Sequence, residues 1–457
     1  MCPGSPGVFL PGNDRPPLLQ GSATIQCIAL VMFPAMLVVA LLQVDEQSAR
    51  RPCAESDLYN GWSGTLSGRS GTLTARPRPQ IAGCSMIVGS GLGLNSTESL
   101  ELVQAIASGA GCNATSLDPA QLVQACVRQL NSIALDGNQL GDAGVAILAG
   151  ALSTPAGREP LPFEMTLSLG AANIGRLGAI ALADLLRRPS NTVVNLALDW
   201  NAIGMEGSVA LGNALSRYRV GSGVMQNTAL RVLGLERCSV GDAGAIALGT
   251  ALSDNPLLPL REIRLEGNGI GPAGAARLGS ALETNTHLRM LNLALNPIGP
   301  AGAIELARGL RRNAALERLD LGGCELGDAG TVALATALRS NLALRTLNLQ
   351  GNGIGAEGAH ALASMLRINP SLRSINLRLN GLGHQAATAL LEAARNGEAA
   401  TRGAGRLEEL LLEHNLVLLD VLPTVGANRT EAAGTLPPTL LAQAASVGVA
   451  ASGAVQS

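Results

Sequence analysis

Between residues 130 and 415 the spacing of the hydrophobic positions changes twice within each repeat of about 28 residues. The first half of a repeat has the form LxxLxLxxN, where apolar and polar residues alternate as in a short strand with one buried face. The second half, IGxxGAxxLAxAL, spaces its apolar residues by three and four, which is typical of an amphipathic helix. The pattern therefore predicts ten β–α units, and LRTLNLQGNGIGAEGAHALASMLRINP from Leu344 is the clearest copy.

A unit of this length cannot bury its apolar face alone, so neighbouring units must stack into a solenoid. We expect the inward residues of the Leu344 unit to be Leu347, Leu349, Ile354, Leu362 and Leu366. Because helices are wider than strands, the stack should bend. The predicted fold is an α/β solenoid, a curved horseshoe with a parallel sheet on the concave face and helices on the convex face.

The ninth position of the strand half carries a polar residue in nine of the ten units. It is Asn138, Asn201, Asn268, Asn296, Asn352, Asn380 or Asn415 in seven units, Cys238 or Cys324 in two, and Ala172 in one. An inward asparagine here can bond the backbone of adjacent units and form a ladder, and losing one such buried partner costs roughly 1–3 kcal/mol. The two cysteines fit the same position as small buried side chains with weak donors, so we interpret them as structural.

This asparagine/cysteine alternation, followed by L-G-x-x-G, resembles the ribonuclease-inhibitor-type leucine-rich-repeat family. Similar repeats occur in NOD-like receptors and in Ran GTPase-activating proteins. Because that family functions mostly by binding, the resemblance implies a scaffold for a protein partner. It leaves two alternatives: a GTPase-activating protein of the Ran-activator type, and the sensor module of a NOD-like-receptor-type protein. The chain lacks the acidic tail of the first and the Walker lysine of the second.

Composition narrows the chemistry that the chain can perform. All 32 basic residues are arginine, so neither a Walker A lysine nor a Schiff-base lysine exists. The G-x-G-x-x-G patterns that begin at Gly269 and Gly353 arise from the repeat itself, and the four histidines are dispersed. We therefore predict no enzyme activity, no cofactor and no metal. A net charge of −2 and 2% aromatic residues also argue against nucleic acid as a partner.

Side chains that flank the inward leucines should project from the sheet face. They are Asp136, Asp199, Glu236, Glu262, Arg264, Glu266, Asn292, Arg318, Asp320, Asn348, Gln350, Asn376, Arg378, Glu409 and Glu413. Eight are acidic and three are basic, an excess that could attract a basic patch on a partner. A merely solvated sheet face is the competing interpretation.

Trp200 stands beside Asn201 at a strand exit, and Arg237 occupies the equivalent position in the next unit. Tryptophan and arginine dominate the energetics of protein interfaces, although Trp200 could simply cover a neighbouring layer. The candidate protein-binding residues are Asp136, Asp199, Trp200, Glu236, Arg237, Glu262, Arg264, Glu266, Arg318, Asp320 and Arg378.

The flanks divide into segments of distinct composition. We expect a disordered leader at 1–22, a linker at 45–95, a helical amino-terminal cap at 96–129, repeats at 130–395, and a degenerate last repeat with a mobile tail at 396–457.

Residues 23–44 are uncharged and apolar, and just reach the length that spans a bilayer. They are a membrane anchor, a targeting signal or neither. Arg50 and Arg51 after them weakly favour cytosolic repeats on a membrane-associated protein. Sequons at Asn95, Asn113 and Asn428 favour a secreted protein instead, and a cytoplasmic protein is the third alternative.

Overall fold

The computed structural model describes residues 52–53, 86–88, 90–108, 131–153, 164–188, 191–216, 218–220, 223–225, 227, 229–396 and 407–415. All of them belong to the compact unit Glu46–Ser457. The predicted leader, the apolar segment 23–44 and the tail after residue 415 lie outside the described residues. Within the described part of the chain, no helix combines the length and apolarity needed to cross a membrane.

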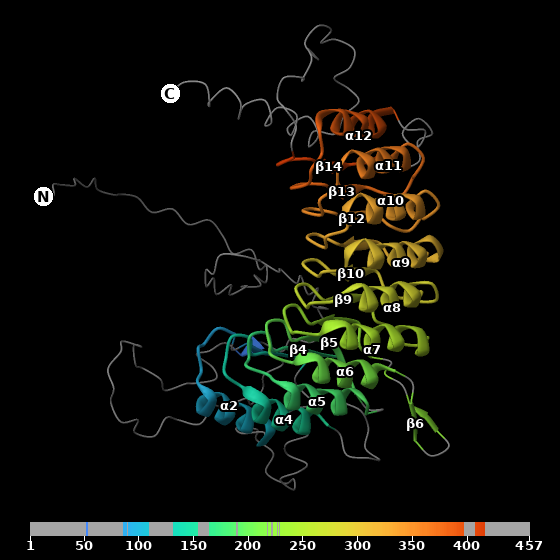
Figure 1. The fold of residues 1–457 in the computed structure, drawn as a ribbon. Coiled ribbons are helices and arrows are strands. Elements are labelled where there is room, and N and C mark those ends of the chain that lie inside the picture. Colours follow the sequence, from blue (N-terminus) through green and yellow to red (C-terminus); the bar gives the residue numbers. More distant parts are fainter. Residues whose placement is uncertain are drawn as a thin grey trace, which may run out of the picture. The chain divides into compact units, whose positions relative to one another are not determined.

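Twelve short strands form one parallel sheet in which successive units lie side by side (Figure 1). In spatial order they are β1 (Pro52–Cys53), β2 (Met86–Val88), β3 (Ser132–Ala134), β4 (Met165–Ser168), β5 (Val193–Ala197), β8 (Val232–Gly234), β9 (Glu262–Arg264), β10 (Met290–Asn292), β11 (Arg318–Asp320), β12 (Thr346–Asn348), β13 (Ser374–Asn376) and β14 (Glu409–Leu411). Leu291, Leu319, Leu347 and Ile375 are aligned on adjacent strands, 28 residues apart. The predicted stack of parallel rungs is therefore confirmed.

One layer of helices covers the other side of this sheet, and each helix packs on the next (Figure 1). They are α2 (Ser96–Ser108), α4 (Gly141–Leu152), α5 (Arg176–Leu186), α6 (Gly204–Leu215), α7 (Gly241–Asp254), α8 (Pro272–Leu282), α9 (Gly299–Arg312), α10 (Gly327–Leu338), α11 (Ala356–Leu366) and α12 (His384–Asn396). The aliphatic side chains between the two layers form one continuous core, which includes all five inward residues predicted for the Leu344 unit.

The stack begins earlier than the repeat pattern indicates. β1 and β2 lie within 45–95, the range expected to be a linker, and β2 pairs with β3 in register. β2 and α2 thus form a further β–α unit, and a capping box marks the start of α2. In this box Asn95 Oδ1 accepts bonds from the N–H groups of Thr97 and Glu98, and Asn95 N donates to Glu98 Oε2. The sequence MIVGSGLGLN lacks the LxxLxL spacing, which explains why this unit escaped prediction.

A second sheet forms in one of the longer connections. β6 (Tyr218–Val220) and β7 (Gly223–Met225) make an antiparallel hairpin between α6 and β8. Asn201 and Cys238 stand 37 residues apart, against the usual 28, and the hairpin forms within the added residues. The parallel sheet continues past it without interruption.

The predicted asparagine ladder runs along the strand exits. Asn296 Oδ1 accepts bonds from the N–H groups of Asn268 and Ile270, at 2.9 and 3.0 Å. Its Nδ2 donates to the carbonyls of Leu265 and Leu293, at 2.8 and 2.9 Å. One buried side chain therefore joins two units through four backbone groups that water does not reach.

The cysteines occupy the same ladder, as predicted. Cys238 Sγ donates to the carbonyl of Leu198 at 3.1 Å, and Cys324 Sγ donates to that of Leu293 at 3.1 Å. Burial raises the pKa of both thiols to about 12, so both are thiols rather than reactive thiolates at neutral pH.

A second asparagine ladder, which the sequence analysis missed, runs along the helix exits. Asn341 Nδ2 donates to the carbonyls of Leu310 and Asn313, and its Oδ1 accepts from the N–H groups of Ala343 and Leu344. The equivalent buried residues are Asn227, Asn255, Asn285, Asn313 and Asn369. The units from α5 to α11 are thus fixed to their neighbours at both ends.

The glycine-rich motif has a structural role as well. Asp242 in α7 accepts bonds from the N–H groups of Gly271 and Gly274 and so caps the next helix, α8. A Cβ at Gly274 would lie 2.8 Å from that carboxylate oxygen and 2.9 Å from the Cβ of Ala245. Asp142 and Asp328 cap α5 and α11 in the same way. The glycine spacing therefore serves helix-to-helix packing within the repeat.

We expect Asn296→Ala to lower the free energy of unfolding by about 1–3 kcal/mol, because it leaves buried backbone groups without partners. Asn296→Cys should cost less, since cysteine already serves at positions 238 and 324. Asn213→Ala, on an exposed position of α6, is the matched control and should show no loss. Urea unfolding followed by circular dichroism measures all three, and equal values for the two alanine variants would contradict the ladder's importance.

Candidate protein-binding surface

The residue just before each ladder position has a left-handed backbone in all ten units. These strand-exit residues are Gly137, Ala171, Trp200, Arg237, Gly267, Leu295, Gly323, Gly351, Leu379 and His414. The stack imposes this conformation, because the strand-exit N–H donates to a carbonyl of the next unit. Trp200 N bonds Glu236 O at 2.7 Å, and Arg237 N bonds Glu266 O at 2.7 Å. For a residue other than glycine the conformation costs roughly 1–2 kcal/mol.

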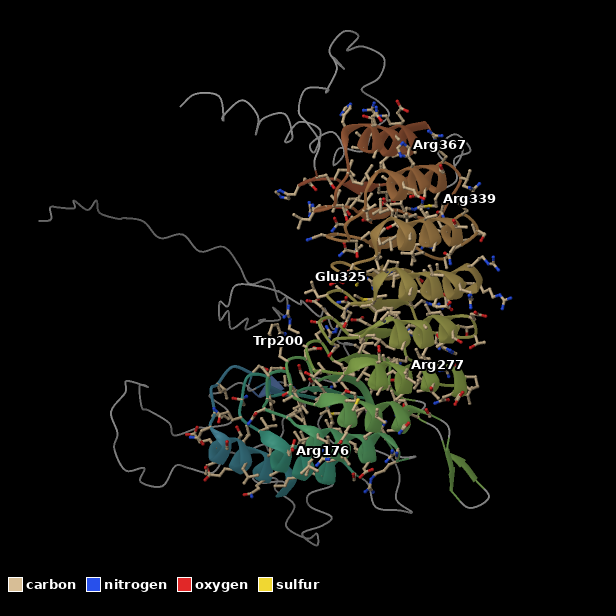
Figure 2. The ribbon with its side chains drawn as sticks, viewed as in Figure 1. Arg176, Trp200, Arg277, Glu325, Arg339 and Arg367 are labelled. Carbon is tan, nitrogen blue, oxygen red and sulfur yellow. The ribbon has the colours of Figure 1, made fainter. Side chains whose placement is uncertain are left out.

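Trp200 and Arg237 occupy adjacent strand-exit positions and touch each other. The guanidinium carbon of Arg237 lies 4.6 Å from the centre of a Trp200 ring, which is cation–π geometry. The stem of Arg237 leans over the next unit, where a Cβ on Gly267 would lie 3.1 Å from Arg237 Cγ. Trp200 remains 61% exposed and projects from the edge of the sheet (Figure 2).

Three carboxylates surround one guanidinium on β5, β8 and β9 and the turns that follow them. Arg264 Nη2 lies 3.3 Å from Asp199 Oδ2, and its Nε lies 3.8 Å from oxygens of both Glu236 and Glu262. The Nε is buried and makes no hydrogen bond within the described residues. A fourth carboxylate, Glu266, lies 3.7 Å from Arg237. We call these six residues, together with Trp200, the acidic cluster.

The negative charge of the acidic cluster exceeds what its two arginines balance. Burial, and then repulsion by Asp199, raises the pKa of Glu236 to about 7, although Arg264 opposes the shift. Burial also raises the pKa of Asp199. A cation brought by a partner would therefore meet carboxylates that lack sufficient countercharge.

The other predicted contact residues lie outside this cluster. Asp136 Oδ1 accepts bonds from Gly170 N and Ser168 Oγ, and Asp320 Oδ1 accepts from Gly322 N and Asn348 Nδ2. Arg318 is exposed on β11, two strands from β9.

Arg378 pairs with Glu413 at the far end of the sheet. The structure thus brings together Asp199, Trp200, Glu236, Arg237, Glu262, Arg264 and Glu266, and leaves Arg318, Asp320 and Arg378 elsewhere on the same face. Asp136 lies beside the cluster, where its charge adds to the causes that raise the pKa of Asp199.

Two exposed strand-exit leucines were not among the predicted contacts. Leu295 and Leu379 are 50% and 52% exposed, and Leu295 covers the space above Gly323. The sequence could have indicated these two leucines, because glycine occupies the same position in four other units and a leucine there departs from that pattern. Within the described residues, no group of three histidines, cysteines or carboxylates is placed to hold a metal ion.

Comparison with known protein families agrees with this architecture. The family described as Leucine Rich repeat matches residues 226–249, 284–307, 312–335 and 340–363. The chain therefore carries leucine-rich repeats, while the ribonuclease-inhibitor subtype stays a resemblance. No curated protein has a sequence that matches this chain.

The similar solved structures are distant in sequence. Leiomodin-1 Actin-Binding Site 2 is 19% identical, covers 35% of this chain and 91% of its own, and has a TM-score of 0.30. The Rad7 and Elc1 complex in yeast is 15% identical, covers 62% of this chain and 79% of its own, and has a TM-score of 0.32. The TLR13–ssRNA13 complex is 17% identical, covers 74% of this chain and 40% of its own, and has a TM-score of 0.38. At these scores the likeness says nothing about a partner.

The raised pKa of Glu236 gives the stability of this protein a distinctive pH dependence. Below about pH 4.5 the folded and unfolded states both hold the Glu236 proton, and above about pH 7 neither does. Between these limits the folded state binds more protons, so unfolding becomes easier as the pH rises. Glu236→Gln should remove this loss. The free energy of unfolding of the variant, taken relative to that of the wild type, should therefore be higher at pH 8 than at pH 4.5 by up to about 3 kcal/mol.

Unfolding curves of the wild type and of Glu236→Gln between pH 4.5 and 8 measure the effect, because the contributions of groups outside the acidic cluster cancel in the difference. Glu357→Gln, at an exposed position of α11, is the control. A constant difference between the wild type and Glu236→Gln across this range would show that Glu236 ionises normally.

Proposed function

We propose that this chain is a non-catalytic protein-interaction scaffold that binds, through the sheet face around Trp200 and Arg264, a partner surface bearing basic residues. The observation that carries the proposal is the backbone of Trp200. Glycine would occupy this left-handed position without strain, and does so in four other units. The large side chain is kept at a cost, and more than half of it faces solvent. Strained residues of this kind gather at functional sites.

Charge supports the class of partner. The acidic cluster holds four carboxylates against two guanidiniums, and the pKa of Glu236 is raised in part by repulsion from Asp199. A lysine or arginine from a partner would relieve this repulsion, while a carboxylate would increase it. The exposed Trp200 ring, already oriented by Arg237, supplies an apolar contact beside the charges.

The GTPase-activating and NOD-like-receptor alternatives stay predictions, since no described side chain favours either. Localisation, including membrane attachment through residues 23–44, also stays a prediction.

Trp200→Gly separates binding from folding. Removing the strained tryptophan should leave the free energy of unfolding unchanged or raise it by up to about 1–2 kcal/mol, because glycine adopts the left-handed backbone freely. The same change should weaken partner binding by about tenfold or more, as expected for an interface tryptophan. Affinity capture from cells with quantitative mass spectrometry, followed by Kd measurement on the purified partner, tests this.

Leu342→Ala is the matched control, because Leu342 is a 69% exposed apolar residue on a different loop, between α10 and β12. Partners bound through the sheet face should be lost with Trp200→Gly and kept with Leu342→Ala. If every captured protein binds both variants equally, the acidic cluster is not the binding surface.

A further inference from the structure

The helix side of the molecule carries a row of arginines that the sequence analysis did not single out. Arg311, Arg339, Arg367 and Arg395 stand 28 residues apart, at the carboxyl ends of the adjacent helices α9 to α12. All four are exposed, and Figure 2 shows Arg339 and Arg367 at the same edge of the helix layer. We call this set the arginine column.

Within the described part of the chain, no side chain of the arginine column forms an ion pair or a hydrogen bond. Neighbouring arginines on α9 behave differently: Arg312 pairs with Glu283 at 2.9 Å, and Arg308 pairs with Glu305 at 3.1 Å. A cation at a helix carboxyl end is favoured by the helix dipole, which explains one arginine per helix. The helix dipole, however, does not account for a cavity next to these arginines.

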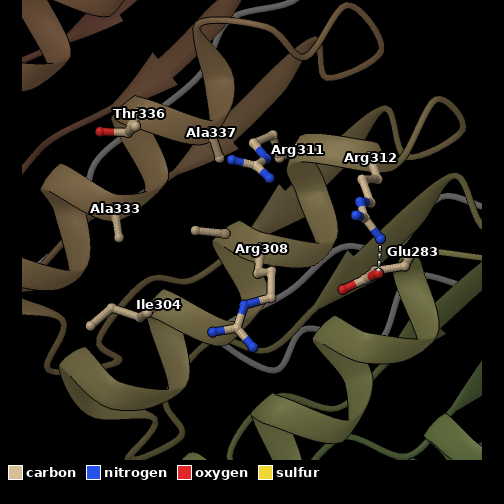
Figure 3. Close-up of a pocket in the computed structure, with 9 residues that line it drawn as sticks. Glu283, Ile304, Arg308, Arg311, Arg312, Ala333, Thr336 and Ala337 are labelled. Carbon is tan, nitrogen blue, oxygen red and sulfur yellow. Dashed lines mark hydrogen bonds and ion pairs between the residues drawn. The ribbon is translucent and has the colours of Figure 1, made fainter.

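Such a cavity adjoins the first residue of the column. Between α9 and α10 lies an open pocket of about 390 Å³ (Figure 3). Ile304, Ala307, Ala333 and Ala337 line it with apolar surface. The remaining lining residues, Arg308, Arg311, Arg312, Glu283 and Thr336, are polar. The pocket therefore combines an apolar surface with three guanidiniums, one of which has no partner.

We propose that this pocket and the arginine column bind an acidic polypeptide segment of a partner, with one apolar side chain of that segment seated between α9 and α10. Adjacent helices lie about 8–10 Å apart, so the column extends roughly 25–30 Å. An extended peptide of about nine residues covers this length. Its carboxylates would face the column while its apolar anchor contacts Ile304 and Ala333.

A nucleic acid fits this surface less well. Single strands bind by stacking bases on aromatic rings, and the described helices contain no phenylalanine, tyrosine or tryptophan. Phosphates could meet the arginines, but the apolar lining of the pocket would then stay unused. The site lies on the opposite layer from the acidic cluster, so a partner here would not compete with one on the sheet face.

The test uses the full chain and a fluorescein-labelled peptide, EEFEEDEEDEE, in anisotropy titrations at 0.1 M salt. Arg311→Gln combined with Arg339→Gln should weaken binding by about tenfold, because two cationic contacts are lost. Arg261→Gln is the control for the loss of an exposed guanidinium that is not part of the column: Arg261 precedes β9, and its loss should leave affinity unchanged. Thermal melts of each variant report whether it folds.

A second comparison isolates the pocket from general charge attraction. Replacing the phenylalanine of the peptide by serine should weaken binding to the wild type by about tenfold, through lost apolar burial. Ala333→Leu fills the pocket at little cost to the helix, since leucine is a good helix former, so with this variant the two peptides should bind equally. A twelve-nucleotide oligouridine is the competing probe.

Three results would overturn the proposal: equal binding of both peptides to the wild type, oligouridine binding as tight as that of the peptide, or an equal loss with Arg261→Gln. Because none of these variants touches the acidic cluster, their outcome is independent of the proposed function.

Discussion

Buried backbone groups at the two ends of each unit are the constraint on which this structure depends. A strand of three residues pairs few of them, and the turns that follow are enclosed by neighbouring units. The two asparagine ladders solve this with one side chain per turn, since an amide both donates and accepts. Asn296 at the strand exit and Asn341 at the helix exit each bond at least four backbone groups across two units.

The exceptions to the ladder follow from the direction of its bonds. Ala172 has no side-chain donor or acceptor, yet the N–H groups of Ala172 and Ile174 are both satisfied by Asn201 of the next unit. Alanine therefore leaves the turn's own donors paired, but it forgoes both the amide's donation and the amide oxygen that would accept N–H bonds from the preceding unit. Cysteine keeps that donation through its thiol. The β6–β7 hairpin is tolerated because it emerges after α6 and before Asn227, so both ladders continue past it.

The repeat explains why the fold was predictable and the site only partly so. The spacing of the apolar residues and the asparagine at the ninth position are local patterns, and each copy of them corresponds to one β–α unit. The missed features connect different units: Asp242 bonds glycines of the next helix, and Arg311 and Arg339 lie on one edge only because each unit of 28 residues returns the chain to that edge. β1 and β2 were missed for the opposite reason, because their unit lacks the pattern. The sequence predicts that Asp199, Glu236 and Glu262 project from the sheet face. It does not predict that all three lie near Arg264, because that depends on how far each side chain extends toward the neighbouring strands.

The same regularity concentrates charge. A solenoid places equivalent positions of successive units in rows, so one residue type at one position becomes a line of that type on the surface. On the sheet face this gathers carboxylates around Arg264, where burial and mutual repulsion raise the pKa of Glu236. On the helix edge it places exposed arginines in a row, the first of which, Arg311, lines a partly apolar pocket. A nearly neutral chain can thereby present two surfaces of opposite sign, and the core need not change, because only positions outside the ladders and the leucine layers differ.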